Sequence, residues 1–372
     1  DGGAGNGLWT SAANWSGDVL PTSIDDVLIG AGAGSVTFNT STTTINSLTL
    51  SGTLAISGGS LTINDATIVS GNLTLSGGTL STNIDTSLPS WTWSGGTLSG
   101  SGKLMTTGTS TLSGTGIKYL SDKVWDNSGT VNLTGALRLV ESDTGTLTTA
   151  VFNNLSGGIV NVDSTDFTPI HVNTSAGKQA FSNAGVLNWN GTHTNGYSDI
   201  RYLTFTNTGA VNVNNNLRLY FTDGVDSGSY TLADGKWLQV YGGSRTFDSP
   251  ASFSLAAGAT NAQLRTWAPV TIADGVTLAN DLLLRVEENV TTYNSTNNLP
   301  LLQVEPGATF TAPNDITVNN LTWTGGTITG AGKLTTTGTS TLSTNNGRFL
   351  SNKVWNNSGT VNFTAGYLRL DD

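Results

Sequence analysis

Short runs in which apolar residues alternate with small polar residues fill most of the chain. In SLTLSGTLAISGGSLTI, which begins at Ser47, leucine or isoleucine stands at nearly every second position, and glycine or asparagine follows most runs. A period of two is typical of a strand with one buried face, and abundant threonine, valine and isoleucine favour extended backbone. The pattern predicts an all-β protein made of many short strands.

A loosely repeated phrase of asparagine, glycine and apolar residues sets the spacing of these strands. Its copies are NSGTVNL at Asn127, SGGIVNV at Ser156, NAGVLNW at Asn183, NTGAVNV at Asn207 and NSGTVNF at Asn357. Through the middle of the chain the copies follow one another in steps of 24 to 29 residues. About 25 residues is typical of one coil of a three-sided β-solenoid, in which each coil pairs with its neighbours. We therefore predict a parallel β-solenoid with glycine and stacked asparagine at its corners.

A much longer repeat relates two distant parts of the chain. Residues 93–134 and 323–364 are identical at 28 of 42 positions at an offset of 230, and swaps such as Leu98 to Ile328, Tyr119 to Phe349 and Leu133 to Phe363 keep apolar positions apolar. We expect a cap and first coil in residues 1–40 and one continuous solenoid in residues 41–372. Because the chain stops inside the second copy, we also expect a longer tandem array. The inward positions predicted from the two copies are Leu104, Leu112, Leu120, Val131, Leu133, Leu334, Leu342, Leu350, Val361 and Phe363.

The N-terminal phrase LWTSAANWSGDVLPTSIDDVLI differs from the coils that follow it. The first coil of a solenoid exposes strand edges that must be covered. We interpret the phrase as a cap made by Trp9, Trp15, Pro21, Asp25 and Asp26, in which the indoles cover the first coil. The alternative is that Trp9 and Trp15 form a platform for a sugar.

This opening phrase, followed by short strands rich in glycine, threonine and serine, resembles the passenger regions of large secreted bacterial surface proteins. These are the filamentous-haemagglutinin-like and autotransporter-type β-helical adhesins, in which a Trp, Asn-Trp, Pro, Asp-Asp phrase often opens a repeat block. The resemblance implies export, a right-handed parallel β-helix and a role in adhesion or surface structure. It implies no catalytic residues.

Composition narrows the possible partners. The net charge of −10 and the lack of a basic run argue against nucleic acid. The chain has no cysteine and no apolar run long enough for a membrane span, so we expect neither disulfides nor membrane insertion. Neither His171 nor His193 has a metal-ligand partner at a usable spacing, so we expect no metal site and no cofactor. Calcium at aspartate-rich corners stays open.

One segment, DGVDSGSYTLADGKWLQVYGGSRTFD, combines aromatic and charged residues. With the preceding tyrosine it provides the parts of a sugar-binding groove, since an aromatic face covers the apolar side of a pyranose and charged neighbours bind hydroxyls. The predicted carbohydrate-binding residues are Tyr220, Trp237, Tyr241, Asp226 and Arg245. Acid–base chemistry on a polysaccharide is the alternative, with Asp223, Asp226, Asp234, Lys236, Arg245 and Asp248 as candidates.

Four arginines stand between two inward residues and should point outward, where aspartate from adjacent coils could pair with them. They are Arg138, Arg218, Arg285 and Arg369. Taken together, the sequence predicts a non-enzymatic structural or adhesive rod segment of an extracellular bacterial surface protein or fibre. Its expected partners are surface glycans, receptors on host or neighbouring cells, or further copies of itself. The alternatives are a carbohydrate-binding β-helix, a polysaccharide lyase or hydrolase, and a self-assembling filament subunit.

Overall fold

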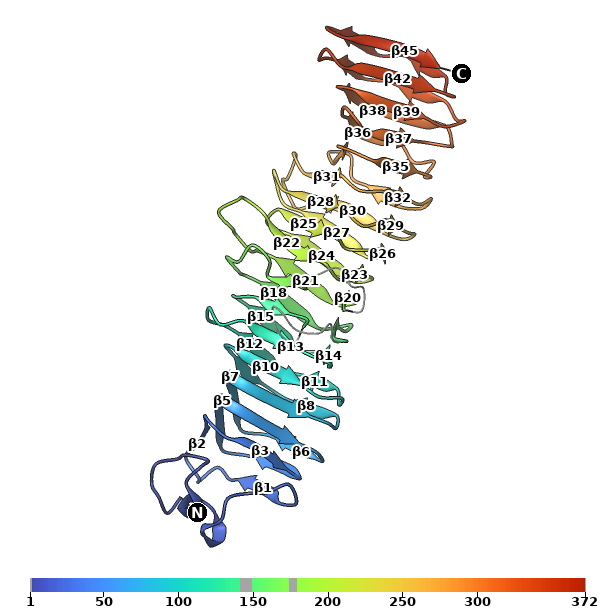
Figure 1. The fold of residues 1–372 in the computed structure, drawn as a ribbon. Helices are drawn as coiled ribbons and strands as arrows, with labels where there is room; N and C mark the ends of the chain where they lie inside the picture. The colour runs from blue at the N-terminus through green and yellow to red at the C-terminus, as the bar shows by residue number, and fades with distance from the viewer. Residues whose placement is uncertain (1, 141–148, 174–178, 372) are drawn as a thin grey trace. The chain divides into compact units, whose positions relative to one another are not determined.

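The chain folds as an all-β parallel solenoid of about 16 turns, which confirms the fold class predicted from the sequence. The computed structural model describes residues 2–140, 149–173 and 179–371. It divides into two compact units, Asp1–Leu187 with Gly191–Thr194, and Asn188–Asn190 with Asn195–Asp372. Within each unit the strands stack rung upon rung (Figure 1). The single continuous solenoid expected after residue 40 stays a prediction.

Each coil of the first unit contributes strands to three sides, and all the strand pairs described are parallel. The first side holds β1 (Asp26–Ile29), β4 (Ser47–Leu50), β6 (Thr67–Val69), β8 (Thr86–Leu88), β11 (Leu104–Thr106), β14 (Val124–Asn127), β17 (Val151–Asn154) and β20 (Ala180–Asn183). The second holds β2 (Ser35–Phe38), β9 (Trp91–Trp93), β12 (Thr109–Leu112), β15 (Thr130–Leu133) and β18 (Ile159–Val162). The third holds β3 (Thr42–Ile45), β10 (Gly96–Ser99), β13 (Lys118–Leu120), β16 (Leu137–Arg138) and β19 (Ile170–His171). The long strands β5 (Thr53–Ile63) and β7 (Asn72–Thr82) run through the second and third sides.

The second unit is built in the same way, and the division between the units falls within β21 (Val186–Trp189). One side holds β22 (Ser198–Arg201), β25 (Leu217–Tyr220), β28 (Trp237–Tyr241), β31 (Gln263–Thr266), β34 (Leu283–Val286), β36 (Leu299–Val304), β38 (Ile316–Trp323), β41 (Thr339–Leu342) and β44 (Thr360–Phe363). Another holds β26 (Gly224–Asp226), β29 (Arg245–Phe247), β32 (Val270–Ile272), β35 (Val290–Tyr293), β37 (Thr309–Thr311), β39 (Gly326–Thr329), β42 (Gly347–Ser351) and β45 (Tyr367–Asp371). The remaining strands are β23 (Thr204–Asn207), β24 (Ala210–Val213), β27 (Ser229–Leu232), β30 (Ser252–Leu255), β33 (Thr277–Leu278), β40 (Leu334–Thr336) and β43 (Trp355–Asn357).

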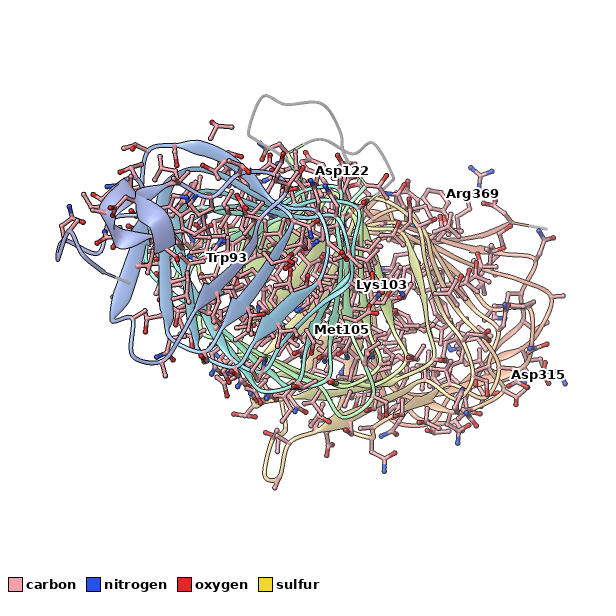
Figure 2. All side chains as sticks on the ribbon, turned by 90° about the horizontal axis from the view of Figure 1, so that it is seen from below. Trp93, Lys103, Met105, Asp122, Asp315 and Arg369 are labelled. Atoms are coloured by element: carbon pink, nitrogen blue, oxygen red, sulfur yellow. The ribbon has the colours of Figure 1, made fainter. Side chains whose placement is uncertain are left out.

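The core follows the alternation of the sequence. Eight of the ten predicted inward residues are buried, but Val361 and Phe363 are 40% and 49% exposed, so these two predictions are wrong. Both lie on β44, which pairs with β41 through one edge, and no described strand covers its other edge. An inward side chain is buried only when coils lie on both sides of it. Figure 2 draws the side chains and labels Trp93, which is fully buried, and Met105 on the outer face.

The coils vary in length instead of keeping to 25 residues. Hydrogen-bonded residues on neighbouring coils are 18 positions apart at Asp85 and Lys103 and 29 apart at Asn154 and Asn183. The strands at both places pair residue by residue without a register shift, so the turns absorb the difference. A long or short turn costs little, because loop-closure entropy grows slowly with length.

Stacked asparagines mark one corner of the first unit, as predicted. Asn127 Nδ2 donates to Asn154 Oδ1 at 2.9 Å, and Asn154 Nδ2 donates to Asn183 Oδ1 at 2.8 Å. All three residues are buried; Asn127 and Asn183 open copies of the repeated phrase, and Asn154 lies two residues before the copy at Ser156. Thr106 completes the ladder by donating its hydroxyl to Asn127 Oδ1 at 3.0 Å. The ladder satisfies amide groups that would otherwise be buried without partners.

The two copies of the long repeat fold alike. The pairs β10 and β39, β11 and β40, β12 and β41, and β15 and β44 begin and end at positions exactly one repeat apart. Internal contacts are also copied. Trp125 donates its indole N–H to Thr106 Oγ1 at 2.9 Å in the first copy, and Trp355 donates to Thr336 Oγ1 at 2.9 Å in the second. The sequence identity therefore preserves a structural block with its polar contacts.

A buried lysine joins three coils of the first unit. Lys123 Nζ donates to the carbonyl and the hydroxyl of Thr82, at 3.1 and 2.8 Å, and to the carbonyl of Gly102 at 2.7 Å. Thr82 lies 41 residues before the lysine and Gly102 lies 21 before it, so the ammonium group contacts the two preceding coils. Three acceptors match the three N–H bonds of an ammonium group.

The second copy repeats this lysine. Lys353 Nζ donates at 2.7 Å to the carbonyl oxygens of both Ala312 and Gly332. Burial lowers the pKa of Lys123 and of Lys353 to about 8, although Asp85 and Asp315 oppose the shift. The folded chain therefore releases these protons at a lower pH than the unfolded chain does.

We expect the unfolding free energy to rise with pH between about pH 7.5 and 9.5, by up to about 1.4 kcal/mol per pH unit for Lys123. Both lysines have a folded pKa of about 8 and an ordinary value of 10.5. The unfolded state therefore binds more protons in this window, and the cost of burying the charge falls as the pH rises. Denaturant unfolding at several pH values measures the slope. Lys123→Met should reduce the slope to the part that Lys353 contributes, whereas Lys103→Met, at an exposed lysine, should leave the slope unchanged. Equal slopes in all three proteins would contradict the assignment.

Candidate functional site

One side of the second unit presents large polar and aromatic side chains outward. Neighbouring strands are in register, so the outward residues of successive coils form columns about 4.8 Å apart. One column consists of Asp199, Arg218, Gln239, Arg265, Arg285 and Gln303. A second column, at the ends of β22, β25 and β28, contains Arg201, Tyr220 and Tyr241. Residues distant in sequence thus share one surface.

Arginines and carboxylates pair along this surface. Arg218 donates from Nε and Nη2 to the two carboxylate oxygens of Asp199, each at 2.9 Å. Burial would lower the pKa of Arg218, but the hydrogen bonds and charge of Asp199 raise it above its ordinary value. The further ion pairs are Arg265 with Glu287, Arg285 with Glu287, and Arg285 with Glu305. The predicted pairing of an outward arginine with an aspartate of an adjacent coil is confirmed at Arg218, whereas Arg285 pairs with glutamates.

The other two predicted outward arginines lie elsewhere. Arg138 is half-buried in the first unit, with its guanidinium 5.9 Å from the ring centre of Tyr119. Arg369 lies on β45 and forms an ion pair with Asp371 of the same strand, and Figure 2 shows it at the periphery. The four arginines therefore point outward but do not form one ladder.

Aromatic rings stack beside the arginine column. The rings of Tyr220 and Tyr241 are 5.1 Å apart and within 7° of parallel, and Trp267 follows Tyr241 at 5.4 Å. Arg218 lies against Tyr220 and Tyr241, at 4.6 and 5.1 Å from their ring centres. Loss of solvation raises the pKa of Tyr220, and neighbouring Tyr202 raises it further. Stacking occupies the faces of Tyr220 and Tyr241, so these two rings cannot serve as flat platforms for a sugar.

Two further aromatic residues occupy the turns beside this stack. Tyr202 has a φ of 59° and Phe221 a φ of 49°, whereas short polar residues such as Asp122 and Asn289 take this conformation at other turns. A bulky residue in left-handed backbone is strained, at a cost of roughly 1–3 kcal/mol, and such strain concentrates at functional sites. We call Tyr202, Tyr220, Phe221, Tyr241 and Trp267, with Arg201, the aromatic corner.

Phe221 lies with one face of its ring against Gly242. A Cβ on Gly242 would lie 2.8–2.9 Å from three carbons of its ring, so the ring lies flat on the glycine backbone. Phe221 is 43% exposed; it meets Tyr220 and Tyr241 edge to face, and its ring centre lies 5.8 Å from that of Tyr202, whose ring is tilted by 39° to it. A ring supported on one face and partly exposed to solvent has the form of a stacking platform. Sequence alternation did not identify it, because a left-handed turn residue falls outside the period of two.

Three of the five predicted carbohydrate-binding residues do not belong to this corner. Asp226 and Arg245 are buried inside the solenoid as an ion pair at 2.5 Å, so the prediction that they contact a sugar on the surface is wrong. Tyr230 donates its hydroxyl to Asp226 Oδ2 at 2.8 Å, and burial raises the pKa of that tyrosine well above its ordinary value. Trp237 starts β28, four residues from Tyr241, and packs against Tyr197.

The acidic residues weighed for catalysis are also dispersed. Asp223 accepts hydrogen bonds from Ser244, and Asp234 accepts from the backbone of Thr260. Asp248 accepts from the backbone N–H of Ser249, just after β29. The exposed carboxylates thus bind turns at different corners, while Asp226 is buried.

The N-terminal cap is held together by its tryptophans. Trp9 is buried, with its ring 4.7 Å from Trp15 and 5.3 Å from Phe38 of β2. Trp15 donates its indole N–H to the carbonyl of Trp9 at 2.7 Å. The backbone N–H of Trp9 donates to Thr37 at 2.9 Å and so satisfies part of the outer edge of β2. The buried Trp9 cannot act as a sugar platform, which removes that alternative for this residue.

The acidic part of the cap phrase stabilises turns. Asp25 Oδ2 accepts from the N–H and hydroxyl of Thr22, and Asp26 Oδ1 accepts from Asn46 and Ser47 of the next coil. These hydrogen bonds lower the pKa of both carboxyl groups. Pro21 is half-buried at the same turn.

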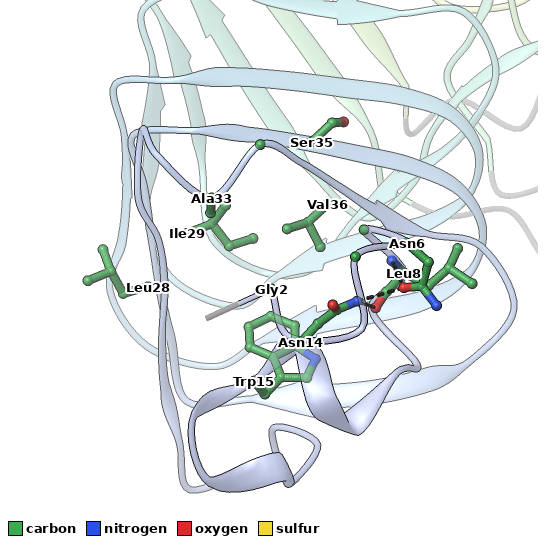
Figure 3. Close-up of a pocket in the computed structure, with 13 residues that line it drawn as sticks. Gly2, Asn6, Leu8, Asn14, Trp15, Leu28, Ile29, Ala33, Ser35 and Val36 are labelled. Carbon is green, nitrogen blue, oxygen red and sulfur yellow. Dashed lines mark hydrogen bonds between the residues drawn. The ribbon is translucent and has the colours of Figure 1, made fainter.

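A pocket of about 380 Å³ lies between the cap and the first coil. Trp15, Leu28, Ile29 and Val36 provide its apolar walls (Figure 3). Asn14 lies at the pocket and donates to Leu8 O and to Asn6 Oδ1, at 2.9 and 2.8 Å. These hydrogen bonds of the Asn14 side-chain amide join parts of the cap to one another.

Among the described residues, no three His, Asp or Glu side chains gather where they could hold a metal ion. No helix in the described part of the chain is long and apolar enough to span a bilayer.

Comparisons of the chain with protein-family models, curated proteins and solved structures found no match. The resemblance to β-helical adhesins therefore stays an expectation. A proposal for function depends on the chemistry of the surfaces described above.

We expect Asp226→Ala to lower the unfolding free energy by about 3–5 kcal/mol, because it leaves the guanidinium of Arg245 buried without a counter-charge. Denaturant unfolding followed by circular dichroism measures the loss. Asp281→Ala, at an exposed carboxylate, should change stability by less than about 0.5 kcal/mol. Equal effects of the two substitutions would argue against the buried pair.

Proposed function

We propose that this chain is a non-enzymatic structural and adhesive segment of an extracellular bacterial surface protein, and that it binds carbohydrate through the aromatic corner of its second unit. The observation that supports binding is Phe221, a half-exposed ring in strained backbone that lies flat on Gly242. Asparagine or glycine would form the same turn without strain. A strained residue is retained where the strain has a use.

The neighbourhood of Phe221 suits a sugar. The exposed part of the Phe221 ring can pack against the C–H groups of a pyranose, and Trp267, which is 37% exposed, extends the apolar surface. Arg201 and the hydroxyl of Tyr202 supply polar groups at the edge of the platform. A few placed polar groups around an apolar surface are typical of specific small-ligand sites.

The proposal of a non-catalytic role is supported by the placement of the acidic residues. Hydrolysis of a glycosidic bond by the usual route requires two carboxyl groups about 5–10 Å apart across the bond. Near the aromatic corner, Asp199 is committed to Arg218, and Asp226 is committed to Arg245 inside the coil. We therefore expect binding without release of new reducing ends.

We expect Phe221→Gly to abolish carbohydrate binding while leaving stability unchanged or raising it by about 1 kcal/mol, because glycine relieves the positive φ. The measurement pairs affinity electrophoresis on a panel of pectin, alginate, xylan and glycosaminoglycan with denaturant unfolding. Val225→Ala, at a 54% exposed residue on β26, is the matched control and should bind as the parent does.

Two outcomes would count against this function. A loss of stability in Phe221→Gly comparable to a core truncation, about 3–5 kcal/mol, would make the ring a packing residue. Parent protein that binds no polysaccharide in the panel would remove the carbohydrate role, and turnover of any of them would place the chain among enzymes.

A further inference from the structure

The seven arginines of the second unit differ in their partners. Five form ion pairs with carboxylates: Arg218, Arg245, Arg265, Arg285 and Arg369. Arg348 is buried and donates to backbone carbonyl oxygens, including those of Ala365 and Thr344. Arg201 remains, and no carboxylate of the described chain pairs with it.

Aromatic rings hold Arg201 in place. Its guanidinium carbon lies 4.5 Å from the ring centre of Tyr202 and 4.4 Å from that of Tyr220. Nη2 donates to the hydroxyl of Tyr202 at 3.1 Å, which uses one of the five N–H donors of the group. The side chain is half-buried, so it is fixed in position but still reaches solvent. Its remaining donors have no partner within the described chain.

We propose that Arg201 is the anion-binding position of the aromatic corner, and that the ligand is a saccharide bearing a carboxylate or sulfate group. This inference rests on the proposed carbohydrate function and adds the class of sugar. The sugar ring stacks on Phe221, and its anionic group accepts hydrogen bonds from Arg201, the residue next to Tyr202. Arginine suits this role because its planar fork matches carboxylate and sulfate oxygens and keeps its charge at all relevant pH values.

Because the chain is negatively charged overall, its affinity for an anionic saccharide depends on Arg201. The net charge is −10, so a polyanion is repelled at long range and must gain its affinity from short-range contacts. Along the same sheet, Asp199, Glu287 and Glu305 already neutralise the other outward arginines. Among the described arginines on this side of the second unit, Arg201 is therefore the one that an anion finds without a carboxylate partner.

The experiment compares the charged and neutral forms of one backbone. Oligogalacturonate and its methyl ester differ in the carboxylate, and dextran sulfate and dextran differ in the sulfate. Dissociation constants are measured by biolayer interferometry at one fixed ionic strength, because added salt would weaken both the arginine contact and the long-range repulsion. The variants are Arg201→Gln, Arg201→Lys and, as a control for charge, Lys333→Gln at an exposed lysine.

We expect the parent to prefer at least one charged form over its neutral partner by about tenfold or more, as a hydrogen bond to a charged group predicts. Arg201→Gln should remove the preference, Arg201→Lys should keep part of it, and Lys333→Gln should leave it intact. The charged form that is preferred identifies the anion as carboxylate or sulfate.

The failure of this inference can be told from the failure of the carbohydrate function. Equal affinity for charged and neutral forms, with Phe221→Gly still abolishing both, would overturn the anion site and leave the sugar platform standing. A preference that survives Arg201→Gln would also overturn it. Binding that depends on Arg201 but not on Phe221 would keep the anion site and reject the platform.

Discussion

Hydrogen bonding between successive coils is the constraint on which this structure depends. Each strand satisfies its backbone through the strands of the coils before and after it, about 4.8 Å away, so every residue lies beside its counterpart on the next coil. Apolar residues therefore stack into a continuous core. Buried amides form the Asn127–Asn154–Asn183 ladder, and on the surface Arg218 meets Asp199 and Tyr220 meets Tyr241.

Much of the fold was predictable because this constraint leaves a local signature. A strand with one buried face must alternate, and Leu48 and Leu50 are buried as their spacing indicates. Coil length left no such signature, since turns of different length join strands that keep the same register. The exposure of Val361 and Phe363 could not be predicted either, because alternation shows which way a side chain points but not whether a coil covers it.

The candidate site was predictable only in part, for a related reason. The outward positions of Tyr220 and Tyr241 follow from alternation, and their stacking follows from register. A charged residue at an inward position looks in the sequence like one at an outward position, so the buried pair of Asp226 and Arg245 was assigned to the surface. Phe221 was missed because its left-handed backbone interrupts the period of two.

Lys123 has a consequence for how the coils of the first unit would respond to force. If each coil contacted only its nearest neighbours, the terminal coils could detach and unfold one after another. The ammonium group of Lys123 ties its own coil to Gly102 and, one coil further on, to Thr82. Detaching one coil there means breaking contacts across three, so the solenoid should give way in blocks. Lys353 repeats the same tie in the second copy, which makes the duplicated sequence a duplicated mechanical element.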